Sequence, residues 1–247
     1  MSKFISITDL AIWIALIAGR LVLCSVIFKK NFFRRMPWFS SYALASTAES
    51  LLLFAVAFLF DYTVYYYVFF VTSHLVSLLA FSALLESGRR VLPGLDLPQK
   101  EKAFTALFAA IAGVVVFVAF WPFRSIESRL ELGAQLIIGV GFIFIAAYAR
   151  YLGLYWSRLV AGVTVTLGGL YLVQATAHAM MFHYGQALVL PVRLLTEIAN
   201  FLAVIAWIVV ILSPWGERKL TEEGLRKIES VLATIEASLR TARIKSS

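Results

Sequence analysis

Charged residues are scarce in this sequence. Lys, Arg, Asp and Glu make up 15% of the 247 residues, whereas hydrophobic residues make up 61%, and the mean hydropathy is +0.86. A typical soluble domain has about 25% charged residues and a smaller apolar fraction. This composition excludes a soluble globular protein and predicts an integral membrane protein.

The sequence also lacks a second cysteine and a proline in the middle of any apolar run. The single cysteine, Cys24, cannot form an intramolecular disulfide. Many transporter sites are built from helices that are broken at mid-membrane, so the proline distribution, together with the absence of a clear internal repeat, disfavours a transporter. The prolines lie at or near run ends, at Pro37, Pro93, Pro98, Pro122, Pro191 and Pro214.

Motifs of common membrane enzymes are missing as well. The sequence contains neither HExxH nor GxSxG, and its aspartates lie at run ends or in loops, so no catalytic group for proteolysis is evident. Every lysine lies outside the apolar runs, which excludes retinal bound as a Schiff base, because that bond needs a buried amine. We therefore favour a non-enzymatic protein and predict no catalytic residue.

Seven apolar runs of about 20 residues are each long enough to span a bilayer as a helix. The segments between some of these runs, together with the segment after the last one, contain most of the lysines and arginines. The positive-inside rule places these basic segments in the cytoplasm and the N-terminus outside. The net charge of +8 is thus a signal of topology and does not indicate a nucleic-acid partner. The runs cover 7–28, 39–60, 63–85, 103–121, 130–149, 156–182 and 190–212.

These runs predict an all-α integral membrane protein, a seven-transmembrane-helix bundle over residues 1–215, followed by a cytoplasmic amphipathic tail at 216–247. Apolar residues in the tail recur with spacings of three and four, the pattern of a heptad seam. Such a short helix is marginal in water, so we expect it to contact a second copy of the chain, another protein, or lipid headgroups. The seam residues are Leu225, Ile228, Leu232, Ile235 and Leu239.

Ionisable side chains inside apolar runs are costly in lipid and are therefore functional candidates. Arg20, Glu49 and His74 of the first three runs and Asn200 of the seventh fall near mid-membrane. We expect Arg20, Glu49 and His74 to form an intramembrane polar network. Arg20 and Glu49 have opposite charges and similar depths, so the sequence predicts an ion pair between them.

A second polar layer, formed by Gln135, Gln174, His178, Arg193 and Glu197, lies nearer the predicted outer face. The sixth and seventh runs each contain a set of polar side chains. Sequential spans with a short connection tend to be neighbours, so these side chains are predicted to enclose a ligand-binding pocket that opens outward, with His178 pointing towards Glu197. Each set recurs at helical spacing and so shares one face of its helix. The sets are Tyr171, Gln174 and His178 on the sixth run and Arg193, Glu197 and Asn200 on the seventh.

The histidines do not predict a metal centre. His178 and His183 are five residues apart, about 140° around a helix, so one helix cannot direct both to a shared metal. A haem held by His74 and His178 is disfavoured, because span counting puts the two histidines about 10 Å apart in depth. No cofactor is predicted, and haem or metal binding is kept as an alternative hypothesis.

The layout of seven spans, an outward N-terminus, short loops and a terminal heptad helix resembles the seven-helix membrane sensor modules found ahead of bacterial histidine kinases and related signalling proteins. The resemblance lies in the span order, in the polar layer at Gln174, His178, Arg193 and Glu197, and in the seam from Leu225 to Ala242. It implies a multi-pass receptor of a bacterial inner membrane. A small ligand or proton near the outer ends of spans six and seven would act on the C-terminal helix and so on a separate partner.

The second hypothesis is an accessory subunit of a larger membrane protein complex. The small residues of AGVTVTLGG, at positions 161–169, are of the type that lets helices approach closely. In this hypothesis they pack against helices of a partner, and the polar groups only hold helices together.

Overall fold

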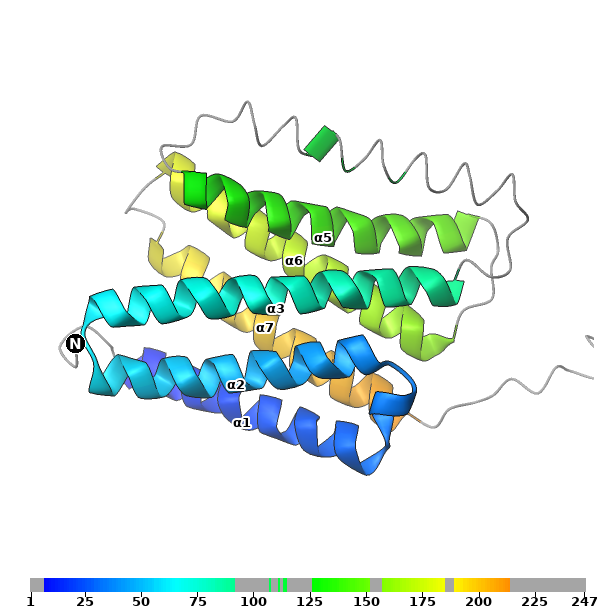
Figure 1. Cartoon of the computed structure of the whole chain (residues 1–247), viewed down its shortest axis with the longest axis horizontal. Helices are drawn as coiled ribbons and strands as arrows, with labels where there is room; N and C mark the ends of the chain where they lie inside the picture. Colours follow the sequence, from blue (N-terminus) through cyan, green and yellow to red (C-terminus); the bar gives the residue numbers. More distant parts are fainter. Residues whose placement is uncertain are drawn as a thin grey trace, which may run out of the picture. The chain divides into compact units, whose positions relative to one another are not determined.

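The computed structural model describes residues 7–91, 126–151, 157–184 and 189–213, together with the single positions 107, 111, 113 and 114. Every regular element in this part of the chain is a helix (Figure 1). The elements are α1 (Ile7–Lys29), the 3-10 turn η1 (Phe32–Arg34), α2 (Pro37–Leu59), α3 (Tyr62–Val91), α5 (Ile126–Tyr151), α6 (Arg158–Tyr184) and α7 (Val189–Leu212).

Six of the seven predicted spans coincide with these helices, and each of the six is long and apolar enough to cross a membrane. The prediction of an all-helical, multi-pass membrane protein is confirmed to this extent. The predicted span at 103–121, except at the four single positions, and the tail at 216–247 lie outside the described residues. The span at 103–121, the orientation and the heptad helix therefore stay predictions.

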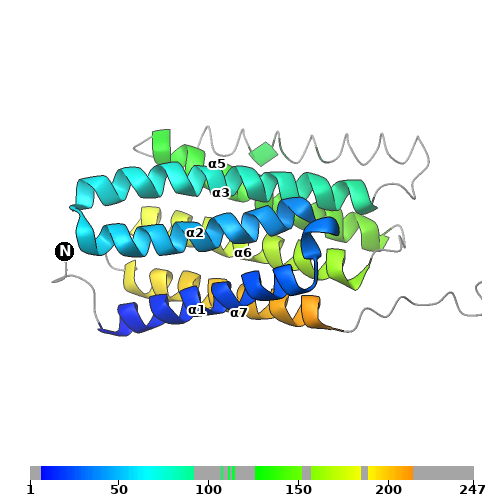
Figure 2. The ribbon, with the colours of Figure 1, turned by 60° about the horizontal axis from the view of Figure 1, so that its bottom comes forward.

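The six long helices form a closed ring in the order α1, α2, α3, α5, α6 and α7. Each helix contacts the next one, and α7 contacts α1, so the first and last described helices lie side by side (Figure 2). In addition, α3 contacts α6. Residues from all six helices therefore face a common interior.

Glycine sets the closest contacts between helices on the α5, α6 and α7 side of the ring. A Cβ atom at Gly162 of α6 would lie 2.6 Å from Val210 of α7, and a Cβ atom at Gly168 would lie 3.0 Å from Phe142 of α5. Because real Cβ atoms are rarely this close to their neighbours, a larger residue would push the helices apart. Two glycines of the segment 161–169, which the second hypothesis assigns to a partner, thus pack against the bundle itself.

Aromatic side chains fill the interior of the ring at the end where α2 begins. The Trp207 ring of α7 lies 5.4 Å from the Phe39 ring and 6.0 Å from the Tyr42 ring of α2, with the rings edge to face. All three side chains are buried. Tyr42 also lines the cavity described next, so this cluster bounds that cavity on one side.

Candidate functional site

A cavity of about 280 Å³, here called the central cavity, lies inside the ring. Every one of the six long helices contributes to its wall, and most of the lining side chains are polar or ionisable. The wall consists of Arg20 from α1; Tyr42, Ser46 and Glu49 from α2; Phe69, Ser73, His74, Val76 and Ser77 from α3; Glu131, Ala134 and Gln135 from α5; Tyr171, Gln174, Ala177, His178 and Met181 from α6; and Thr196 and Asn200 from α7.

Arg20 connects α1 to α2 at the wall of the central cavity. One terminal nitrogen of its guanidinium donates to the backbone oxygen of Ser46 at 2.7 Å and to the hydroxyl of Ser50. Both serines are buried. A guanidinium has five N–H donors, and within the described residues the others have no protein acceptor. Arg20 therefore offers both positive charge and hydrogen-bond donors to a molecule in the cavity.

The ion pair expected between Arg20 and Glu49 is not formed. The Glu49 carboxylate instead accepts a hydrogen bond of 3.1 Å from the Thr72 hydroxyl of α3. Arg20 binds Ser46 and Ser50, which lie three residues before and one residue after Glu49 on α2, and these groups occupy the guanidinium. Arg20 and Glu49 still line the same cavity.

His178 faces α5, and its acidic neighbour is Glu131. The two atoms Nδ1 of His178 and Oε2 of Glu131 are 3.8 Å apart, a distance at which a protonated ring forms an ion pair but no hydrogen bond. The amide of Gln135, one turn further along α5, donates to the other oxygen of Glu131 at 3.5 Å. The predicted pairing of His178 with Glu197 is therefore wrong, because the polar face of α6 turns towards α5 and the cavity and not towards that part of α7.

Arg193 and Glu197 pair with each other along α7, with Nε of Arg193 3.0 Å from Oε1 of Glu197. They line a second cavity, of about 400 Å³, between α1, α2, α3 and α7. Arg20, Glu49 and Phe69 line both cavities, so the two cavities adjoin at these three side chains. Arg193 and Glu197 therefore lie outside the wall of the central cavity.

Seven of the nine residues predicted from the sequence line the central cavity, and Arg193 and Glu197 are the two that do not. His74 is held by a 2.7 Å contact between Nδ1 and the backbone oxygen of Phe70. Because a carbonyl oxygen can only accept, Nδ1 carries the hydrogen and Nε2 is the nitrogen available to other partners. The seven residues are Arg20, Glu49, His74, Tyr171, Gln174, His178 and Asn200.

Sequence reasoning missed several residues of the wall, most importantly Glu131. Glu131 lies at the edge of an apolar run, where a carboxylate is unremarkable, although its spacing of four from Gln135 is a signal of a shared helical face. Tyr42, Ser46 and Glu49 on α2 also recur at helical spacing. Tyr42 and the serines of the wall were not predicted, because a hydroxyl group is tolerated in a membrane helix.

The chemistry of the wall suits recognition of a small polar molecule. It combines one guanidinium, two carboxylates, two imidazoles and several hydroxyl and amide groups. Within the described residues, no group of three His, Cys, Asp or Glu side chains is placed to hold a metal ion. Comparisons with protein-family models, with curated proteins and with solved structures find no match to this chain.

Proposed function

We propose that this chain is a non-enzymatic, receptor-like membrane protein that binds a small ligand in the central cavity and signals through its C-terminal tail to a separate partner protein. The observation that supports this proposal is that all six long helices contribute polar side chains to one cavity. In lipid such groups are costly unless they have a partner or face water. A polar ligand that replaces water in the cavity gives them a function.

The size and charge of the cavity define the class of ligand. Its volume of about 280 Å³ is at the lower limit of small-molecule sites, so the ligand is a compact polar molecule. Arg20 binds an acidic or carbonyl group, and the pair of Glu131 and His178 binds a hydrogen-bond donor or a cationic group. The ligand thus spans α1, α5 and α6.

The helix α7 links the cavity to the output. Thr196 and Asn200 of α7 line the central cavity, and α7 ends at Leu212, immediately before the segment that contains the predicted heptad seam. If α7 has two positions and the ligand binds more tightly to the protein in one of them, the ligand shifts the equilibrium of α7 towards that position. The tail then transmits that shift to its partner.

A proton is the alternative input to the same site. His178, Glu131, His74 and Glu49 all line the cavity, and protonation of His178 creates an ion pair with Glu131 across α5 and α6. A change in tail crosslinking with pH in the absence of added ligand, lost in His178→Ala, supports the proton as input.

The experiment is to purify the protein in lipid nanodiscs, identify bound small molecules by mass spectrometry, and measure their affinity. We expect His178→Ala to weaken binding and to abolish the effect of ligand on crosslinking through a cysteine placed at Leu232 of the tail. His183→Ala is the matched control, because His183 is an exposed histidine of the same helix. Equal binding by the two variants and the wild type contradicts the proposal.

The same sample tests the other two hypotheses. Membrane proteins that co-purify in fixed ratio support an accessory subunit, although Gly162 and Gly168 already pack within the bundle. A Soret band or bound metal supports a haem or metal protein, for which His74 and His178 of the central cavity are the first ligands to replace.

A further inference from the structure

An open groove of about 400 Å³ lies between the start of α2 and the end of α3, and we call it the arginine groove. It shares no lining residue with the central cavity, so an argument about its occupant is independent of the proposed receptor function. It is lined by Pro37, Trp38, Ser82, Leu85, Glu86, Arg89 and Arg90.

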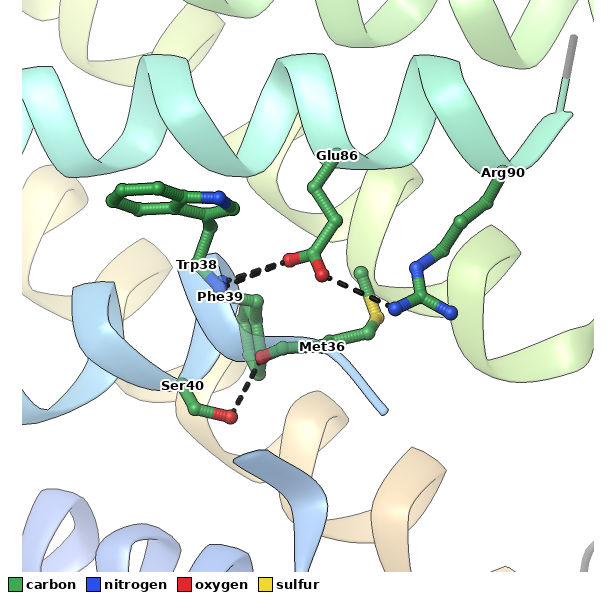
Figure 3. Close-up of polar contacts among 6 residues, drawn as sticks. All are labelled: Met36, Trp38, Phe39, Ser40, Glu86 and Arg90. Carbon is green, nitrogen blue, oxygen red and sulfur yellow. Dashed lines mark hydrogen bonds and ion pairs between the residues drawn. The ribbon is translucent and has the colours of Figure 1, made fainter. Parts of the chain in front are cut away.

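Glu86 occupies the buried side of the groove and is fully engaged by the protein (Figure 3). One carboxylate oxygen accepts from the backbone N–H groups of Trp38 and Phe39, at 3.1 and 3.2 Å. The other oxygen accepts from Arg90 at 3.2 Å. Because Glu86 satisfies these first N–H groups of α2, the helix start is not offered to a ligand. The arginines are the binding groups that remain.

Arg89 and Arg90 give the groove a net positive charge. The Arg90 side chain is 39% exposed, and only one of its nitrogens is used by Glu86. Arg89 is exposed and makes no hydrogen bond or ion pair within the described residues. Two guanidinium groups against one carboxylate leave about one unit of positive charge, which favours an anionic group such as a phosphate.

The groove continues into an apolar strip on α3. Leu78, Ser82, Leu85 and Arg89 follow each other at spacings of four, three and four, so they share one face. Leu78 is 64% exposed and Leu85 is 49% exposed, and Trp38, 48% exposed, forms the wall on the α2 side. In a membrane such leucines face acyl chains, and tryptophan is enriched at the headgroup level.

We propose that the arginine groove binds an anionic phospholipid. The phosphate lies between Arg89 and Arg90, and an acyl chain follows Leu85 and Leu78 along α3. A free phosphate compound satisfies only the arginines and leaves the apolar strip without a partner, so the combination of charge and apolar surface assigns the site to a lipid.

The test uses the full-length protein in nanodiscs that contain equal amounts of phosphatidylglycerol and phosphatidylcholine, with retained lipid measured by native mass spectrometry. We expect phosphatidylglycerol to be retained preferentially by the wild type. Arg89→Gln lowers this retention about fivefold, as loss of one interfacial arginine predicts, whereas Arg89→Lys keeps most of it. Arg150→Gln is the matched control, because Arg150 is also an exposed arginine in the last turn of its helix, α5.

Three outcomes overturn the assignment. One is equal retention of the two lipids, and another is an unchanged ratio in Arg89→Gln. The third is displacement of phosphatidylglycerol by millimolar glycerol 3-phosphate, which shows that the groove binds a soluble phosphate. Arg89 is exposed and has no hydrogen bond or ion pair among the residues that the structure describes, so we expect its replacement to leave folding intact, and a thermal unfolding curve checks this.

Discussion

His178 of α6 and Glu131 of α5 face each other at the wall of the central cavity, with Nδ1 and Oε2 3.8 Å apart. Their side chains are 19% and 34% exposed, so neither is sealed from the cavity. A partly exposed pair of this kind contributes at most about 1 kcal/mol to the free energy of unfolding. The pair is therefore better suited to binding than to holding α5 against α6.

The small contribution of the His178–Glu131 pair to stability gives the first prediction. We expect His178→Ala and Glu131→Gln each to weaken ligand binding about tenfold or more, since hydrogen bonds to charged groups are the stronger ones. The unfolding free energy changes by less than about 1 kcal/mol in either variant. Binding titrations and thermal unfolding of the same nanodisc samples measure both quantities. A large loss of stability with unchanged affinity means that the pair is structural.

The polar side chains on the wall of the central cavity predict that water enters it, and therefore that a cysteine placed on this wall can be modified selectively. Cys24 is buried, and Cys24→Ala gives a background without thiols. In that background, we expect Gln174→Cys on the cavity wall to react with a water-soluble thiol reagent. Leu202 is 59% exposed but lies on an apolar face of α7, so Leu202→Cys does not react, because thiolate formation needs water. Mass spectrometry after labelling of intact cells measures the fraction of each variant that is modified. Labelling of Gln174→Cys only from inverted vesicles contradicts the predicted outward opening.

The hydrogen bonds of Glu86 predict that its replacement lowers the free energy of unfolding. Glu86 lies at the end of the bundle away from the central cavity. Its side chain is 6% exposed, and Glu86→Ala removes the acceptor of the Trp38 and Phe39 N–H groups. We expect a loss of about 1–3 kcal/mol, the cost of unsatisfied buried donors. Glu86→Gln keeps one acceptor oxygen and loses less. The comparison is by unfolding in mild detergent with Arg89→Gln as control, and equal stability of all three variants shows that the cap contributes nothing.

The glycine contacts predict different results at two positions of α6 that are seven residues apart. Gly162→Val places atoms where Val210 of α7 lies 2.6 Å from the ideal Cβ position, whereas nothing lies within 4 Å at Gly169. Overpacking costs about 1–3 kcal/mol, so Gly162→Val lowers the unfolding temperature and Gly169→Ala leaves it unchanged. If Gly169→Ala alone disrupts co-purification with another membrane protein, the accessory-subunit hypothesis gains support.

The predicted span boundaries agree well with six helices, and the main deviation has a physical cause. The third run was predicted to end at residue 85, but α3 continues to Val91, because Glu86 caps α2 and binds Arg90. A charged residue ends an apolar run in the sequence. It does not end a helix when the structure provides partners for it.

The pairing of polar residues was predicted less well. Six residues of the sixth and seventh runs were assigned to one site from helical spacing and from the short connection between the runs. Tyr171, Gln174, His178 and Asn200 do line one cavity, whereas Arg193 and Glu197 do not. The partners were wrong for His178 and for Arg20, because spacing determines which residues share a face but not which helix that face meets. Glu131 could not be chosen as the partner of His178 without knowing that α5 packs against α6 on the cavity side.

The sequence by itself determined that this is a helical membrane protein and which residues of each helix share a face. Both depend on local quantities, the hydrophobicity of runs and the 3.6-residue period. Only the tertiary structure decided that the six helices form a ring, that Arg20 binds Ser46 and Ser50, and that His178 meets Glu131. These contacts depend on helix order and rotation, which are set by close packing between distant segments such as Gly162 against Val210.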